Sequence, residues 1–331
     1  MRKLHGLAAL ILCGSWSWSA PVGADPVTDW NEIAQPAIAT GRPGPPGALD
    51  SALVQIAVHD AVQALDRRFE PYHVEVKGAK GRRAAAVAAA AHDVLVGLYP
   101  AQQMAMDTAY FNYLANNGLN GDPGLLVGQK VAAGILPLAR KAPNPPPPDF
   151  NGGNEPGQWR PTDSFIGNPP GPPPPFSPMT APWMGALDPF TLTAGTRFRA
   201  PPPPALTSER YRRHYNEVKV LGRFDSTVRT PEQTDIAYFY SENFLAQWNR
   251  ALRAIATAHL HRTGDSARLF ALANIATADA VITAWDSKRF YNFWRPLTAI
   301  REGDNDTNPQ TVGDTGWKPL INTPPYPDYT S

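Results

Sequence analysis

The chain is organised around residues 267–301, ARLFALANIATADAVITAWDSKRFYNFWRPLTAIR. Gly264-Asp265-Ser266 precede this stretch as a helix start, so the sequence predicts a long helix that runs to about position 290 and carries Lys288. Arg295 follows seven residues later, just under two helical turns, and we expect both side chains on one face. Pro296 disfavours the α region for Arg295 and is expected to stop the helix there, freeing the guanidinium to turn back.

Lys288 and Arg295 together are typical of a clamp for a tetrahedral oxyanion, because lysine supplies a flexible point charge and arginine a rigid fork. A water-poor environment strengthens the attraction of such a pair for an anion. Five aromatic side chains are expected to wall the pair off from water: Trp285, Phe290, Tyr291, Phe293 and Trp294. The plain alternative is a pair of solvated cations near a helix end, and Trp285 fits a core position as well as a pocket wall.

Lys288, six intervening residues and Arg295-Pro296 resemble the first oxyanion motif of the vanadium-dependent haloperoxidases, which type 2 phosphatidic acid phosphatases and bacterial acid phosphatases share. The flanking words AWDSKRFYNFWRPLTAIR and DTGWKPLINTPPYPDY resemble secreted bacterial haloperoxidase-like proteins. The family's next motif contains Ser-Gly-His, and Ser331 matches its serine. The glycine and histidine of that motif, and the Arg and His of the third, do not follow, so the resemblance predicts a C-terminally truncated member.

The resemblance implies a mainly α fold, a helical bundle of the haloperoxidase and acid phosphatase type. It implies vanadate, or phosphate as the alternative occupant, bound by Lys288, Arg295 and Ser331, with no metal ion ligated directly. Both family histidines would lie beyond Ser331, so no catalytic residue is assigned, and we expect the chain as written to be inactive. The implied substrates are hydrogen peroxide and a halide, and the implied assembly is a homodimer.

Two other functions stay open on the sequence. The first is a phosphatase of the same superfamily, which would hydrolyse a phosphate monoester or a lipid phosphate. The second is a non-catalytic helical protein in which Lys288 and Arg295 bind an anion and nothing more. A net charge of +1 argues against a nucleic-acid partner, which needs a strongly basic surface.

Residues 1–24 have the pattern of a secretory signal peptide. Met1-Arg2-Lys3 is a basic start, the run to Cys13 is mostly apolar, and Val22-Gly23-Ala24 is a small-residue cleavage site. The apolar run is too short to span a membrane. Cys13 is the only cysteine, so the mature protein would form no disulfide, and we expect a bacterial protein that is secreted or periplasmic.

The remaining chain divides by composition into three parts. Residues 25–141 form an N-terminal helical region, 142–206 a proline-rich strap with interleaved aromatics, and 207–331 the start of the catalytic bundle. A flexible linker is the other interpretation of 142–206. Helices are predicted over these ranges: 48–65, 82–99, 101–117, Asp122 to about Arg140, 207–222, Thr230 to about His261 as one long helix, and 264–290.

Histidines and an acidic loop raise the possibility of a metal site, but neither predicts one. His259 and His261 are two apart and point to different faces of a helix. Core or interface positions suit His59, His92 and His214 better. Glu302, Asp304 and Asp306 resemble a weak calcium pattern without its later glutamate, which favours a turn.

Overall fold

The computed structural model describes residues 25–142, 149–162 and 178–329, and these residues form a mainly α fold. The only β pairing among them is two isolated bridges, Gln158 with Phe293 and Arg223 with Pro319. The predicted fold class is therefore confirmed. The predicted signal peptide and Ser331 lie outside the described residues, as do parts of 142–206.

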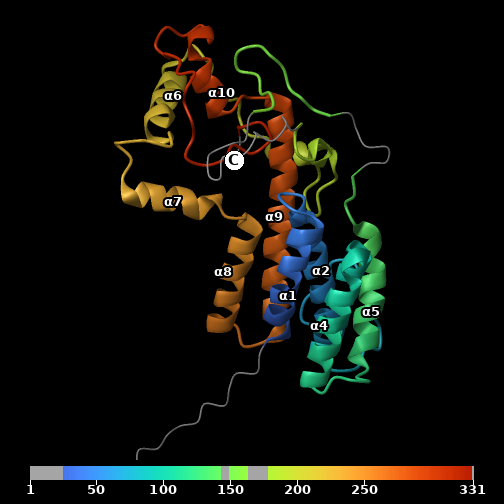
Figure 1. Ribbon diagram of the computed structural model, residues 1–331. Helices are drawn as coiled ribbons and strands as arrows, with labels where there is room; N and C mark the ends of the chain where they lie inside the picture. Colours follow the sequence, from blue (N-terminus) through green and yellow to red (C-terminus); the bar gives the residue numbers. More distant parts are fainter. Residues whose placement is uncertain (1–24, 143–148, 163–177, 330–331) are drawn as a thin grey trace, which may run out of the picture.

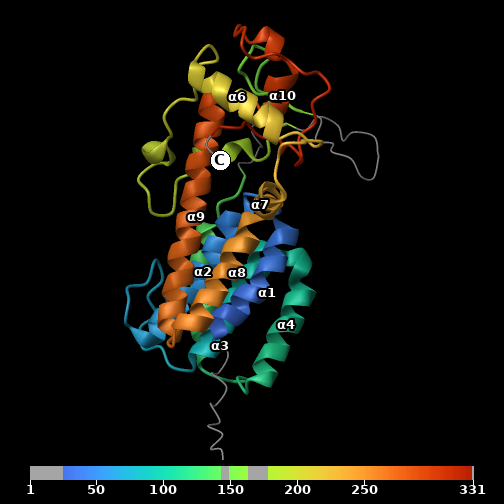
Figure 2. The same ribbon diagram turned by 90° about the vertical axis from the view of Figure 1, so that its left-hand side faces the viewer.

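Seven helices form the bundle in the lower part of Figures 1 and 2. They are α1 (Pro26–Gly41), α2 (Gly47–Asp66), α3 (Arg83–Leu98), α4 (Gln103–Asn116), α5 (Gly124–Ile135), α8 (Phe244–His259) and α9 (Thr263–Tyr291). Helix α2 packs against α1, α3, α5 and α9 and is buried over almost its whole length. Its apolar residues on all sides therefore reflect a central position in the core.

Helix α9 projects beyond this bundle, and its upper end is surrounded by a second group of elements (Figure 1). These are α6 (Glu209–Leu221), α10 (Pro296–Arg301) and the C-terminal loops, with α7 (Pro231–Ser241) between the two levels. The short helices η3 (Pro182–Ala186) and η4 (Gly195–Phe198) of the proline-rich segment pack on α9. Helix α9 thus connects the core to the region that carries Lys288.

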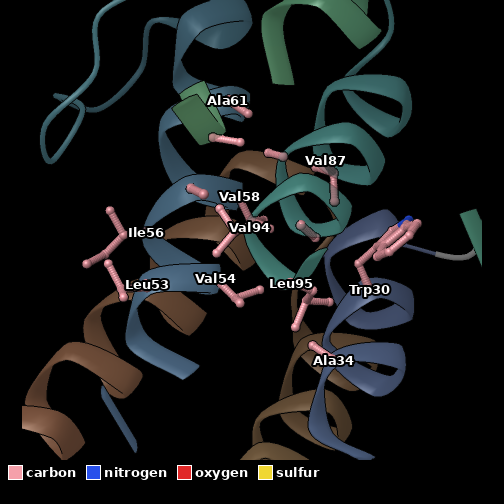
Figure 3. Packing of buried hydrophobic residues seen from close by; sticks show 14 of the residues in the cluster. Trp30, Ala34, Leu53, Val54, Ile56, Val58, Ala61, Val87, Val94 and Leu95 are labelled. Carbon is pink, nitrogen blue, oxygen red and sulfur yellow. The ribbon is translucent and has the colours of Figure 1, made fainter. Parts of the chain in front are cut away.

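Small residues set the spacing of the core helices. Helix α3 is alanine-rich, and α5 lies so close to it that a Cβ at Gly128 would collide with the backbone of Ala86 and Ala90. Figure 3 shows larger side chains from α1, α2 and α3 that belong to this core, among them Trp30, Leu53 and Leu95. Trp30 and Leu53 are fully buried, which contributes about 1.5–3 kcal/mol for each such side chain.

A buried amide network sets the register of α1, α8 and α9. The Asn31 Nδ2 donates to Asn249 Oδ1 (2.7 Å), and Asn274 Nδ2 donates to the same oxygen (3.2 Å). Ser51 of α2 donates to Asn274 Oδ1 at 2.8 Å. All four side chains are at most 2% exposed, so a polar group left without its partner would lower the stability of the fold. The network therefore favours one arrangement of the helices.

The single helix predicted from Thr230 to His261 is wrong. The predicted capping box is present, with Gln233 N donating to Thr230 Oγ1 and Thr230 N to the Gln233 side chain. However, Glu242 is extended, and the Asn243 side chain accepts from Leu245 N and Ala246 N, which starts α8 anew. Asparagine competes for the backbone as an N-cap, so the amphipathic pattern spans two helices.

Two other boundaries differ from the sequence prediction. Helix α1, which contains Pro36, is not among the helices predicted from the sequence; Asp25 caps it by accepting from Val27 N. Helix α5 ends at Ile135, earlier than the expected Arg140, since Pro137 cannot continue an α-helix. The other predicted helices are present within a few residues.

The histidines of α2 and α3 are buried and bonded to protein groups. His59 Nε2 lies 3.1 Å from the Glu70 carbonyl. His92 contacts the carboxylates of Asp93 and Asp107 at 2.7 and 2.9 Å. Burial opposes the charging of His92, but these two hydrogen bonds outweigh it and raise its pKa. No group of three potential metal ligands occurs among the described residues.

Helix α9 alone, among single helices in the described part of the chain, has the length and hydropathy of a membrane span. Half of its most apolar window is buried inside the protein. The bent pair formed by 83–98 and 100–116 passes the same test only if it is counted as one segment. This composition is weak evidence for a span, because a core helix has it too.

Candidate oxyanion site

The end of α9 differs from the predicted geometry. The helix ends at Tyr291, where Asn292 takes a left-handed conformation (φ 48°). Arg295 is extended (φ −79°, ψ 152°), as expected before proline, but Pro296 begins α10 and does not end α9. Lys288 and Arg295 therefore do not share a helix face. Asn292 changes the direction of the chain after α9, and both side chains contact Tyr326 and Asp328.

Both cations point into the protein and meet the loop 326–329. Lys288 is 1% exposed, and its Nζ donates to the carbonyls of Pro327 (3.0 Å) and Asp328 (2.6 Å). Arg295 is 8% exposed; its Nε donates to the Tyr326 carbonyl (2.7 Å) and its Nη1 to the Asp328 carboxylate (2.8 Å). The Tyr326 ring lies near both, 5.1 Å from Lys288 Nζ and 4.7 Å from Arg295 Cζ.

Lys288 and Arg295 are both shielded from water, and this burial affects their charges. Burial, and to a smaller extent the charge of Arg295, lower the pKa of Lys288 to about 7, with Asp328 opposing both. Arg295 Nη2 is buried and has no hydrogen-bond partner among the residues that the structure describes. A buried guanidinium donor without an acceptor is costly, and a further oxygen at this point would satisfy it.

The aromatic surroundings of the site are only partly those predicted. Trp285 is 4% exposed, packs on Tyr326 with ring centroids 5.0 Å apart, and donates from Nε1 to the Thr180 carbonyl. Phe290 is 61% exposed and lies under Arg199, so it does not wall the cations off. Trp294 is buried in a separate cluster with α6.

Tyr326 was missed in the sequence prediction, although it stands in the PPYPDY segment that carried part of the resemblance. A tyrosine in a proline-rich loop has no periodic pattern that would place it. Its position beneath both cations depends on the return of the chain to α9.

The described parts of the proline-rich segment hold the upper half of α9 in place. Arg199 forms a two-pronged ion pair with Asp286 (2.6 and 2.8 Å). Asp279 accepts from the backbone of Phe190, Thr191 and Leu192. Earlier in the same segment, Trp159 N donates to the Asn292 carbonyl at 2.7 Å. These contacts fix the helix end from which Lys288 projects.

Comparisons with known proteins point to one superfamily. A family model described as the VCPO second helical-bundle domain matches residues 268–331, the part that carries Lys288 and Arg295. Vanadium chloroperoxidase from Curvularia inaequalis is 31% identical over 197 residues. In sequence the chain is thus similar to the vanadium haloperoxidases, most specifically over residues 268–331. The aligned part covers 50% of this haloperoxidase-like chain but 32% of that relative, so the chain spans about a third of the relative's length.

Solved structures show the same fold. The first bacterial vanadium-dependent iodoperoxidase superimposes with a TM-score of 0.74 at 21% identity, covering 92% of this haloperoxidase-like chain and 76% of that chain. An apo-type bacterial vanadium-dependent chloroperoxidase superimposes with a TM-score of 0.64 at 18% identity, and the match covers 87% of this chain and 74% of that one. The predicted helical bundle of the haloperoxidase type is thereby confirmed.

Proposed function

We propose that Lys288 and Arg295 bind a tetrahedral oxyanion, vanadate, in a protein that oxidises halide with peroxide. The observation that supports this most directly is Arg295 Nη2, a buried charged donor with no partner in the described part of the chain, beside a second buried cation. Solvated surface cations would be exposed and would have no reason to converge. The related proteins named above are vanadium-dependent by their own descriptions.

The residues of this cluster fit an oxyanion well. Bound vanadate would supply the activation of peroxide for halide oxidation. Arg295 would donate from its fork and Lys288 from its ammonium, while Trp285 and Tyr326 keep water away. Ser331, by resemblance, would add a hydroxyl donor. Phosphate is also a tetrahedral oxyanion, so it is the alternative occupant.

Asp328 has a specific place in this proposal. Its carboxylate is the acceptor for Arg295 Nη1 and is 36% exposed at the side chain, against 10% for Arg295. An anion entering the cluster meets this carboxylate at close range and is repelled by it. Asp328 is therefore an internal counter-ion that balances Arg295 and that an oxyanion must compete with or displace.

The wider biology remains a proposal of the same kind. We infer an exported bacterial protein with 1–24 as its leader, acting on hydrogen peroxide and a halide, assembled as a homodimer. The division into a helical region (25–141), a strap (142–206) and the beginning of a catalytic bundle (207–331) belongs to this proposal. The related chloroperoxidase and iodoperoxidase act on small molecules by their names, which supports small-molecule substrates here.

Isothermal titration with vanadate and with phosphate tests the proposal. Wild type is expected to bind, and Lys288→Ala and Arg295→Ala are each expected to weaken binding by roughly tenfold or more, since each removes a charged hydrogen bond. Arg289→Ala is the matched control, because it removes an exposed cation next to Lys288 on the same helix. Equal binding by all four proteins, or none by wild type, would contradict the proposal.

Two activity assays separate the candidate reactions. Bromination of a phenol indicator that requires both vanadate and peroxide identifies a haloperoxidase. Hydrolysis of a phosphate ester without vanadate identifies a phosphatase. Binding without either reaction is the result expected of a non-catalytic anion-binding protein.

A further inference from the structure

The loop 325–328, which contacts both cations, has few backbone donors of its own. Two of its four residues are prolines without an amide hydrogen, so only Tyr326 and Asp328 can donate from the backbone. Their amides bond the carbonyls of Pro324 (2.9 Å) and Phe293 (3.0 Å). The carbonyls of the loop therefore need donors from other parts of the chain.

Three of the four loop carbonyls accept from the cations themselves. Arg295 donates to the Tyr326 carbonyl, and Lys288 donates to those of Pro327 and Asp328. An oxyanion bound at these cations would take donors that now hold the loop. This step rests on the proposed function. The loop then needs an anchor that does not depend on the cations.

Thr180 of the proline-rich segment supplies such an anchor. Its backbone amide donates to the Pro325 carbonyl, the fourth carbonyl of the loop, at 2.8 Å. Its own carbonyl accepts from Trp285 Nε1 of α9 at 2.9 Å. The backbone of one residue thus bridges the loop and the helix that carries Lys288.

Close packing of η3 on α9 fixes the position of Thr180. Ala181 takes a left-handed conformation (φ 48°, ψ 55°) and leads directly into η3. Met184 of η3 is fully buried. Gly185 lies so close to α9 that an added Cβ would be 2.5 Å from the amide nitrogen of Asp286. A side chain at position 185 would therefore force η3, and Thr180 with it, away from α9.

We propose that Thr180 and Gly185 are positioning residues for the oxyanion cluster. Through them the proline-rich segment holds the loop 325–328 on α9 while Lys288 and Arg295 bind an anion. Neither positioning residue has to contact the anion. A segment that only covered α9 would leave the loop unchanged when η3 is displaced.

Hydrogen exchange followed by NMR on the full chain tests this role in Gly185→Ala. Exchange of the Thr180 and Asp328 amides is expected to become at least about tenfold faster, because the loop loses its anchor. Amides of α2 should keep their wild-type rates, which excludes general unfolding. Ala186→Ser changes the next residue of η3, which is exposed, and is the matched control.

Titration with sulfate at pH 6 and pH 9 tests the effect on the cations, since sulfate itself does not titrate in this range. Burial lowers the pKa of Lys288 to about 7, with Arg295 and Asp328 as the other charged groups that act on it. Wild-type affinity for sulfate should therefore fall by roughly tenfold or more from pH 6 to pH 9. Gly185→Ala is expected to bind roughly tenfold more weakly at pH 6 and to change little up to pH 9, because water that reaches Lys288 returns its pKa towards the ordinary value.

Unchanged exchange of the Thr180 and Asp328 amides in Gly185→Ala, or a wild-type pH profile for sulfate in that variant, would overturn the positioning role. Should Gly185→Ala fail to fold, Trp285→Phe removes the donor to the Thr180 carbonyl and keeps an aromatic ring, and the same faster exchange is expected. Wild type that binds no tetrahedral oxyanion would contradict the proposed function, and the exchange rates alone would then decide the positioning role.

Discussion

The sharpest test of the cation cluster is Lys288→Met measured as a function of pH. Methionine keeps most of the volume of lysine and removes the charge. Burial lowers the pKa of Lys288 from an ordinary value of 10.5 to about 7 in the folded chain. Between these two values the unfolded chain binds more protons than the folded one, so the stability of wild type rises with pH.

The size of the effect follows from the same two values. Within this window wild type gains about 1.4 kcal/mol per pH unit, and the full difference between pH 6 and pH 9 is roughly 3 kcal/mol. Lys288 is 1% exposed, so solvent screening does not reduce this value much. Methionine leaves the carbonyls of Pro327 and Asp328 without their donor, but that loss does not change with pH.

Urea unfolding at pH 6 and pH 9 measures the difference. The stability of Lys288→Met relative to wild type is expected to fall by roughly 3 kcal/mol from pH 6 to pH 9. Lys318→Met removes an exposed lysine and should stay within about 0.5 kcal/mol of wild type at both pH values. Saturating phosphate should flatten the wild-type slope, because a bound anion keeps Lys288 protonated. A Lys288→Met difference that is the same at both pH values would refute the buried-cation reasoning.

Three further predictions concern other parts of the chain. Asp328→Asn removes the counter-ion of Arg295 and is expected to tighten vanadate binding by roughly tenfold in a titration at low salt; weaker binding would show that Asp328 holds Arg295 in position instead. Asn249→Ala leaves the amides of Asn31 and Asn274 without their shared acceptor and is expected to lower the free energy of unfolding by about 2–3 kcal/mol in urea, a loss below 1 kcal/mol arguing against the network. Asn243→Ala removes the cap of α8 and is expected to lower the free energy of unfolding by about 1 kcal/mol in urea. An unchanged free energy of unfolding would mean that tertiary packing alone starts that helix.

Much of the local structure could be predicted because it depends on neighbours in the sequence. The capping box at Thr230 and Gln233 and the extended backbone of Arg295 before Pro296 are decided within a few residues. The apolar pattern of 48–65 likewise predicted a helix. Where two local signals competed, as at Asn243, the side-chain cap outweighed the continuing amphipathic pattern and the single long helix was wrong.

The sequence by itself determined a mainly α chain and named Lys288 and Arg295 as the pair to examine, because helix signals and a short motif are local. Only the tertiary structure decided how that pair meets. Asn292 turns the chain at the end of α9, and the loop 326–329 returns from far along the sequence to place Tyr326 and Asp328 against both cations. Contacts between residues more than thirty positions apart follow from packing of the whole chain, and no local pattern encodes them.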